Sequence, residues 1–195
     1  LDGVQAVVDG AAGTLTLAPS SADLAAADAV KKQGAVDATR RAALRGKPCV
    51  MANGTRVHLY ANIGSADGAT RAVEVGAEGV GLLRSEFLLL DRETPPDERE
   101  QLRAFTKVLE TLGSGRPLTL RLADIGGDKE IPYLKLPHEA NPFLGLRGYR
   151  LAMIKDRPDL RALFASQVAA ALRAAAAMGG ALRMMAPMIS VRAEV

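Results

Sequence analysis

From residue 57 onward, short apolar runs alternate with longer segments in which apolar residues recur at intervals of three and four positions. The short runs predict four strands: VHLYANIG (57–64), GVGLLRSE (79–86), PLTLRLAD (117–124) and ALRMMAPMIS (181–190). The longer segments predict three helices, over 65–76, 94–113 and 159–180. Because strand and helix alternate throughout, we expect an α/β fold with a parallel sheet.

The first 46 residues follow a different pattern. Residues 1–20 predict short strands separated by glycine-containing turns, and residues 21–46 predict one long Ala-rich helix that ends near Gly46. A single helix between two strand-rich regions is typical of a connector between modules. We therefore expect three parts, with boundaries at 1–20, 21–46 and 47–195.

The helix predicted over 94–113 carries signals for both of its ends. Thr94 is placed to cap the first turn, and Pro95 is placed at the first helical position. Gly113 follows the last apolar residue of the segment and predicts its end.

Composition narrows the classes of function. The 195 residues are 48% hydrophobic and 24% charged, which is ordinary for a globular protein, and the net charge of +3 is too small to indicate nucleic-acid binding. No apolar run reaches the length of a membrane span. The one cysteine, Cys49, excludes a disulfide framework, favours a reducing compartment, and is expected to be a small buried residue.

Polar residues gather where the predicted strands end. The first strand ends in Asn62, the second in Arg84 and Glu86, and the third in Arg121 and Asp124. In parallel α/β sheets the carboxyl ends of the strands are where ligands bind. Alternation along the second strand is expected to place Glu86 on the same face as Arg84.

Two arginines at the ends of successive parallel strands can point at one spot. A buried guanidinium is costly unless an anion neutralises it, and it binds phosphate or carboxylate in a bidentate manner. The pair Arg84 and Arg121 therefore predicts an anion site. The alternative is that Arg84 forms an ordinary salt bridge, for example with Glu86.

The glycine pair in RLADIGGDK follows the third strand. Gly126 and Gly127 have no Cβ, so the backbone there could turn sharply and offer its N–H groups to an anion, with Asp128 and Lys129 orienting the turn or adding charge. The alternative is an ordinary loop between strand and helix, in which Asp124 caps a turn and Lys129 is solvated.

The sequence gives less support to a nucleotide-binding site or a metal site. GVGLLRSE lacks the third glycine of a dinucleotide fingerprint, and no GK[ST] phosphate loop occurs. His58 is predicted inside a strand, and His138 stands in KLPHEANPF. Neither has a cysteine or a second histidine nearby, so we expect structural roles and no metal site for both.

Several motifs, in order, resemble one known family. VGLLRSEFLLLDR, LRLADIGGDKEIPYL and NPFLGLRGYR are similar to phosphoenolpyruvate-protein phosphotransferase, Enzyme I of the bacterial sugar phosphotransferase system, as are ANIGS and RMMAPMIS. The resemblance covers nearly the whole chain. It implies that residues 1–20 end a swivelling phosphohistidine domain, that 21–46 form its linker helix, and that 47–195 form the first half of a phosphoenolpyruvate-binding (β/α)₈ TIM-type barrel.

The resemblance also implies site residues. Arg84 and Arg121 are expected to contact phosphoenolpyruvate, and Asn62, Asp124, Lys129 and Arg147 are further candidates. One departure is Leu122, since the family usually has Thr after the arginine. The family's phospho-accepting His is expected upstream of Leu1, and its Mg²⁺-binding Glu and Asp and its proton-donating Cys beyond Val195, so the chain alone is expected to be inactive.

The reaction that the resemblance implies moves the phosphoryl group of phosphoenolpyruvate to a histidine of the enzyme and then to the carrier HPr. It also implies Mg²⁺ in the intact enzyme, a homodimer and a cytoplasmic location. Two alternatives remain open. One is an enzyme of the pyruvate phosphate dikinase or phosphoenolpyruvate synthase type, and the other is a non-catalytic binding or scaffold module derived from the barrel.

Overall fold

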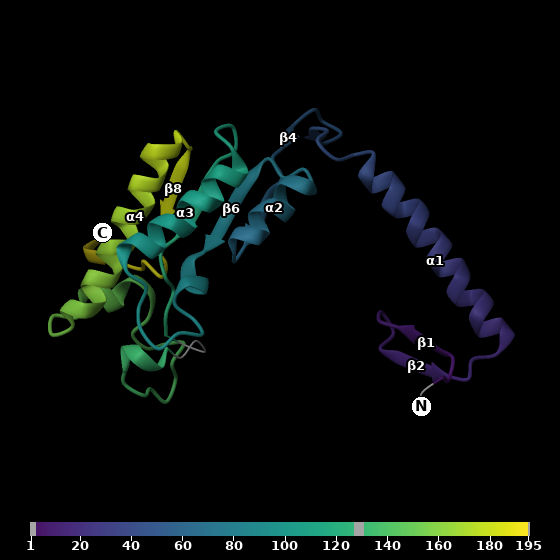
Figure 1. Cartoon of the computed structure of the whole chain (residues 1–195), viewed down its shortest axis with the longest axis horizontal. Helices are drawn as coiled ribbons and strands as arrows, with labels where there is room; N and C mark the ends of the chain where they lie inside the picture. Colours follow the sequence, from purple (N-terminus) through teal and green to yellow (C-terminus); the bar gives the residue numbers. More distant parts are fainter. Residues whose placement is uncertain (1–2, 127–130, 195) are drawn as a thin grey trace. The chain divides into compact units, whose positions relative to one another are not determined.

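The computed structural model describes residues 3–126 and 131–194 (Figure 1). They fall into two compact units, Leu1–Lys47 and Pro48–Val195.

The first unit is a hairpin followed by a helix. Strands β1 (Ala6–Asp9) and β2 (Thr14–Leu17) pair antiparallel, and α1 covers Ser21–Ala42. Ser20 begins the helix because its hydroxyl accepts the amide hydrogen of Asp23, while the Asp23 carboxylate accepts that of Ser20. The short strands and the long helix are as predicted, but the helix ends four residues before Gly46. That the hairpin belongs to a phosphohistidine domain stays a prediction.

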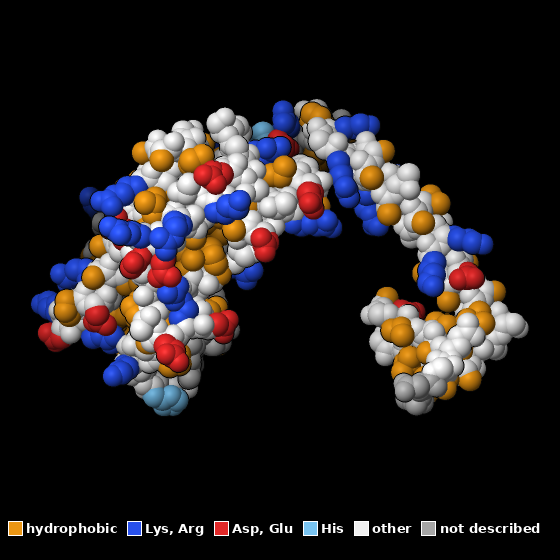
Figure 2. Space-filling view, viewed as in Figure 1, with side chains coloured by type: hydrophobic (Ala, Val, Ile, Leu, Met, Phe, Trp, Pro, Cys, Tyr) orange, Lys and Arg blue, Asp and Glu red, His pale blue; other side chains and the backbone are white. Residues whose placement is uncertain are grey.

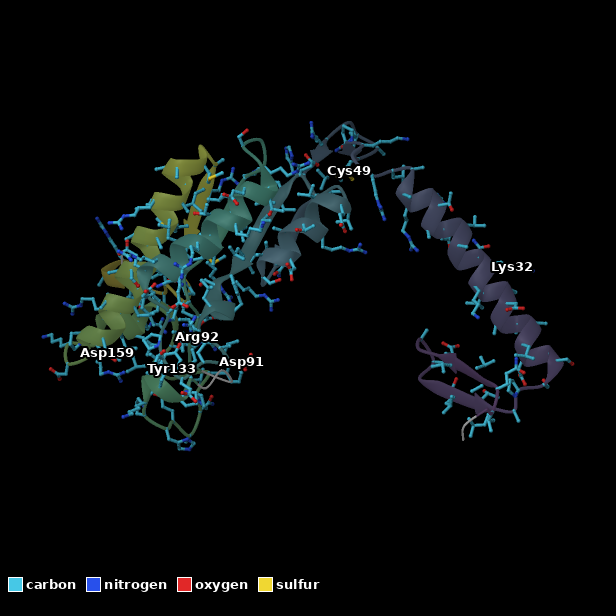
Figure 3. The ribbon with its side chains drawn as sticks, viewed as in Figure 1. Lys32, Cys49, Asp91, Arg92, Tyr133 and Asp159 are labelled. Carbon is cyan, nitrogen blue, oxygen red and sulfur yellow. The ribbon has the colours of Figure 1, made fainter. Side chains whose placement is uncertain are left out.

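The second unit begins with a small hairpin of two two-residue strands, β3 (Cys49–Val50) and β4 (Arg56–Val57). Cys49 is exposed on it (Figure 3), so the prediction that this residue is buried was wrong. The reason is that the hairpin pairs with itself and does not join the main sheet. For the same reason the first strand of the main sheet starts at Tyr60, and His58 lies between strands rather than inside one.

The main sheet has four parallel strands in sequential order: β5 (Tyr60–Ile63), β6 (Gly79–Arg84), β7 (Leu118–Arg121) and β8 (Leu182–Met185). Three helices lie along one face of it (Figure 1): α2 (Ala66–Glu74), α3 (Glu98–Leu112) and α4 (Pro158–Met178). The predicted α/β class and parallel sheet are confirmed. Sequential strands with helices on one face are consistent with part of an α/β barrel, and the half-barrel itself stays a prediction.

Among the described residues, the second unit also has four short 3₁₀ helices: η1 (Ser85–Leu88), η2 (Pro132–Leu134), η3 (Gly148–Met153) and η4 (Arg192–Glu194). The first of them corrects a prediction. The chain leaves the strand geometry after Arg84, so Glu86 lies on η1 and does not share a strand face with Arg84.

The main core lies between the sheet and its helices. Leu83 and Leu120 on the strands and Phe105 and Leu109 on α3 are almost fully buried there. Side chains alternate along a strand, so the neighbours of these core residues, Arg84 among them, point to the opposite face. On the outer side, acidic and basic side chains are interspersed over α3 and α4 (Figure 2), and one ion pair, Glu98–Arg173, joins the two helices.

A second core supports the loops at the carboxyl end of the sheet. It is formed by Leu89, Leu122, Ala123, Ile125, Ile131, Leu134, Leu151, Leu160, Leu163 and Phe164. Tyr133 lies beside it and donates its hydroxyl to the carbonyl of Leu89 at 2.8 Å, and burial raises the pKa of that hydroxyl. Figure 3 shows Tyr133 and Arg92 at this end of the unit. The loops that follow β6 and β7 are therefore packed against a core of their own.

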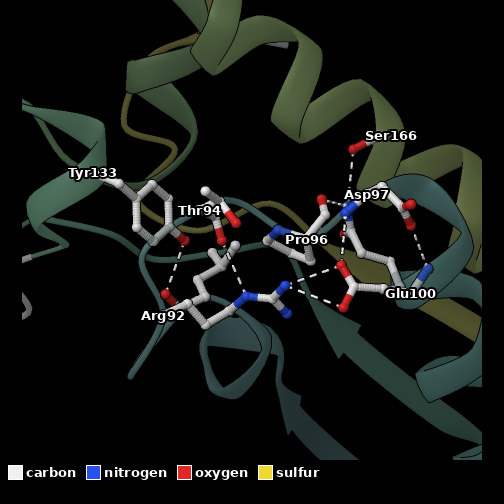
Figure 4. Close-up of polar contacts among 9 residues, drawn as sticks. Arg92, Thr94, Pro96, Asp97, Glu100, Tyr133 and Ser166 are labelled. Atoms are coloured by element: carbon white, nitrogen blue, oxygen red, sulfur yellow. Dashed lines mark hydrogen bonds and ion pairs between the residues drawn. The ribbon is translucent and has the colours of Figure 1, made fainter.

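The start of α3 differs from the prediction. Asp97, not Thr94, caps the helix: its carboxylate accepts the amide hydrogen of Glu100 at 2.7 Å, and the Glu100 carboxylate accepts that of Asp97 at 3.1 Å (Figure 4). This reciprocal pair satisfies the amide of Asp97 and the first-turn amide of Glu100. Arg92 also binds Glu100 through its Nη2, which lowers the pKa of Glu100. The predicted end at Gly113 is confirmed.

Candidate functional site

Arg84 and Arg121 end two neighbouring strands at the same edge of the sheet. They are direct partners in the parallel register of β6 and β7. The residues before them, Leu83 and Leu120, are also partners and are buried against the helices. Both arginines therefore project from the face without helices, as expected for side chains that alternate along adjacent strands.

Arg121 is held by two carboxylates. Its Nη2 donates to Glu86 Oε1 at 2.6 Å, and its Nη1 lies 3.6 Å from Asp124 Oδ2. The Glu86 side chain is only 3% exposed and that of Arg121 is 18% exposed, so the bond is shielded from water. Glu86 thus binds Arg121 and not Arg84, and the alternative of a salt bridge between Arg84 and Glu86 was wrong.

Arg147 joins the same cluster from a distant part of the chain. Its Nη2 and Nε donate to the two oxygens of Asp124 at 3.1 and 3.3 Å, and its guanidinium lies 5.4 Å from the centre of the Phe143 ring. Asp124 therefore bridges Arg121 and Arg147. The structure brings three of the predicted candidates together through charge-assisted contacts.

Arg84 differs from the other two arginines. It is exposed and forms no ion pair with any described residue. Its guanidinium lies against Gly64: a Cβ added to that glycine would lie 3.2 Å from Arg84 Nη2. Asn62 on β5 is also exposed. It is the register partner of Leu82, so it lies on the face of the sheet without helices, as Arg84 does. Three guanidinium groups and two carboxylates leave the described cluster with an excess positive charge, which suits an anion.

The backbone at and after the end of β7 is fixed by contacts from two other elements, η1 and β8. Ser85 Oγ donates to the carbonyl of Arg121 at 2.7 Å, and the amide of Leu122 donates to the carbonyl of Met185 at 2.9 Å. The amide of Asp124 donates to Glu86 Oε1 at 2.9 Å. Leu122, the departure from the family pattern, points into the second core and leaves these bonds intact.

Gly126 is required by close packing. Its φ is +97°, and a Cβ there would lie 2.9 Å from Arg147 Cβ and 3.1 Å from the carbonyl oxygen of Leu146. The glycine lets the loop after β7 touch the segment that carries Arg147. That its amide binds an anion stays a prediction. Gly127, Asp128 and Lys129 lie outside the described residues.

We expect Gly126→Ala to destabilise the second unit by about 1–3 kcal/mol, because a side chain at this positive φ is strained and collides with Arg147. Gly115→Ala is the matched control, since its surroundings are open and its φ lies outside the left-handed region. Urea unfolding of both variants measures the effect. Equal midpoints would show that the loop yields freely and that Arg147 is not held by this contact.

Neither histidine bonds to a residue of the arginine cluster in the described part of the chain. His58 Nδ1 is 2.9 Å from Glu78 Oε2, which Arg56 also binds, and these two bonds lower the pKa of Glu78. His138 lines a cavity of about 210 Å³ with Lys135 and Glu139. Across residues 3–126 and 131–194, no three His, Cys, Asp or Glu side chains are arranged to hold a metal ion. No set of three such ligands for Mg²⁺ is therefore present in this part of the chain, and the ion stays an expectation for the intact enzyme.

Within the same residues, every helix is too short or too polar to cross a membrane.

The fold and the cluster define an α/β protein with a group of arginines and carboxylates at the carboxyl ends of its strands. Comparison with known proteins adds the family. Residues 38–195 match the family model of the PEP-utilising enzyme, PEP-binding domain. The chain belongs to this family of phosphoenolpyruvate-utilising enzymes.

Individual relatives agree with the family match. Over its whole length the chain is 45% identical to a phosphoenolpyruvate-protein phosphotransferase of Haloferax volcanii, and over 99% of its length it is 44% identical to a multiphosphoryl transfer protein of Rhodobacter capsulatus. Over 96% of its length it is 39% identical to a phosphoenolpyruvate-protein phosphotransferase of Staphylococcus epidermidis. The chain spans 32%, 22% and 32% of these three relatives, in that order.

Proposed function

We propose that this chain forms part of the phosphoenolpyruvate site of a phosphoenolpyruvate-dependent phosphotransferase of the sugar phosphotransferase system. The observation that carries the proposal is the register pair Arg84 and Arg121 at the carboxyl edge of a parallel sheet, in a chain that belongs to a phosphoenolpyruvate-binding family. The names of the relatives favour this reaction over that of a dikinase or synthase.

In the proposed site, Arg84 and Arg121 grip the phosphate of phosphoenolpyruvate. The P–O bond to the enolate oxygen breaks as a P–N bond forms to a histidine of the enzyme, which then passes the phosphoryl group to HPr. Such a transfer depends mainly on positioning and on neutralising the phosphate oxygens and the leaving enolate, and guanidinium groups do both. Asp124 and Glu86 hold Arg121 in place, and Arg84 supplies charge that no described carboxylate offsets.

The wider assignment belongs to the same proposal. The second unit is half of a phosphoenolpyruvate-binding barrel, and the first unit is the end of a phosphohistidine domain with its linker helix. The intact enzyme uses Mg²⁺, dimerises and acts in the cytoplasm. Asn62, Lys129 and Arg147 are secondary candidates for contact with the substrate.

The test is to follow the labelled phosphoryl group of phosphoenolpyruvate on the full-length protein. We expect label on a histidine of the protein and, once HPr is added, on HPr. Label that passes to a nucleotide instead would identify a dikinase or synthase type of enzyme. Binding of phosphoenolpyruvate without any transfer of label would identify a non-catalytic module.

A further inference from the structure

The hydrogen-bond ladder of β7 stops just before the site. The amide of Leu122 makes the last bond to β8, at 2.9 Å to the carbonyl of Met185. The next two amides, of Ala123 and Asp124, have no strand beside them, although both residues are buried. A buried amide without a partner is costly, so these two groups need acceptors from elsewhere.

Side chains provide the two acceptors. Glu86 Oε1 accepts from Asp124, and Gln167 Oε1 accepts from Ala123 at 2.9 Å. Gln167 lies on α4, is 1% exposed, and reaches a residue that is 44 positions away in the chain. A buried glutamine side chain is costly where it serves packing alone, because an apolar side chain fills the same space without losing hydration.

The position of that bond gives it a role in the site. Ala123 lies between Asp124 and the strand end that carries Arg121, so a shift of its amide moves both side chains. Asp124 in turn sets the position of Arg147, through two bonds. A displacement at Ala123 is therefore transmitted to two of the three guanidinium groups.

We propose that Gln167 is a positioning residue: by holding the amide of Ala123, it sets the geometry with which Arg121 and Asp124 meet the anion. The proposal rests on the proposed function, because it concerns affinity for phosphoenolpyruvate. It adds a residue that touches neither the substrate nor the arginines.

The chain offers a matched control in Gln101. This glutamine is also fully buried, on α3, and donates through Nε2 to Ser166 Oγ at 2.9 Å. In each glutamine one atom of the side-chain amide is hydrogen-bonded. The other atom, Oε1 of Gln101 or Nε2 of Gln167, has no partner among the described residues. Gln101 bonds to Ser166 and Pro96 and not to Glu86 or the arginines, so its replacement removes a buried amide of the same kind away from the site.

The experiment measures the dissociation constant of phosphoenolpyruvate by calorimetry on the full-length protein, at a temperature at which every variant is folded. Gln167→Met keeps the volume and removes the acceptor. We expect it to weaken binding about tenfold, which corresponds to about 1.4 kcal/mol, because the amide of Ala123 loses its partner and Arg121 and Asp124 then shift from the geometry that meets the anion. Gln101→Met is expected to bind phosphoenolpyruvate within about twofold of wild type. Its urea midpoint is expected to fall about as far as that of Gln167→Met. Gln167→Glu retains an acceptor and is expected to recover most of the affinity.

Three outcomes decide the matter. Tenfold weaker binding in Gln167→Met, but not in Gln101→Met, supports the positioning role, and recovery in Gln167→Glu assigns it to the acceptor. Equal affinity in Gln167→Met and wild type overturns it and leaves Gln167 as a core residue. If the wild-type protein itself does not bind phosphoenolpyruvate, the proposed function fails, and with it the premise of this inference.

Discussion

Replacing Arg84 by alanine is expected to weaken phosphoenolpyruvate binding by about tenfold to hundredfold and to leave stability almost unchanged. The loss corresponds to one charge-assisted contact of about 1.5–3 kcal/mol. Stability is expected to stay because Arg84 is exposed and forms no ion pair with any described residue. Calorimetric titration and urea unfolding of the full-length protein measure the two quantities.

Arg84→Lys is the control for charge. Lysine keeps the positive charge but lacks the planar fork that binds phosphate in a bidentate manner, so we expect it to recover the affinity only in part. Phosphotransfer between HPr and the acceptor histidine, which does not use this site, is expected to survive in both variants. A fall in stability with unchanged affinity would instead make Arg84 a structural residue.

Replacing Arg121 by alanine is expected to reduce both affinity and stability. The affinity loss has the same cause and the same size, about tenfold to hundredfold. The stability loss arises because the variant removes the 2.6 Å bond to the buried Glu86 and the ion pair with Asp124, a change of about 1.5–3 kcal/mol. The two arginines occupy equivalent positions in the sequence pattern, but their different surroundings lead to different expected effects on stability.

Glu86→Gln is the control for Arg121. This variant weakens the contact between residue 86 and Arg121, but it keeps the arginine and an acceptor for the amide of Asp124. We expect some loss of stability with phosphoenolpyruvate affinity within about threefold of wild type, since the anion-binding charge is still present. If Glu86→Gln abolished binding while Arg121→Ala did not, the carboxylate and not the guanidinium would be the functional group.

Much of the fold could be predicted because local periodicity determines it. The strands that contain Leu83 and Leu120 are apolar runs in the sequence, and Gly113 follows the last residue of α3. Each of these signals lies within a few residues of the element that it predicts. Local signals failed where two of them competed. Thr94 and Asp97 both qualify as caps, and the reciprocal bond with Glu100 decides for Asp97.

The site could be predicted only in its outline. Parallel strands bring their carboxyl ends together, so the sequence places Arg84 beside Arg121. It does not reveal that the chain enters a 3₁₀ helix after Arg84, which turns Glu86 toward Arg121. Gln167 was not foreseen, because its bond to Ala123 joins a helix to a distant loop and has no local signal.

The most direct test of a shared anion site is a double-mutant cycle. The dissociation constant of phosphoenolpyruvate is measured for the wild-type protein, Arg84→Ala, Arg121→Ala and the double variant. If both arginines grip the same phosphate, each single variant binds more weakly and the two effects are not additive, with a coupling of about 0.5–3 kcal/mol. Wild-type affinity in either single variant would contradict the account, because that arginine would then have no part in binding the substrate.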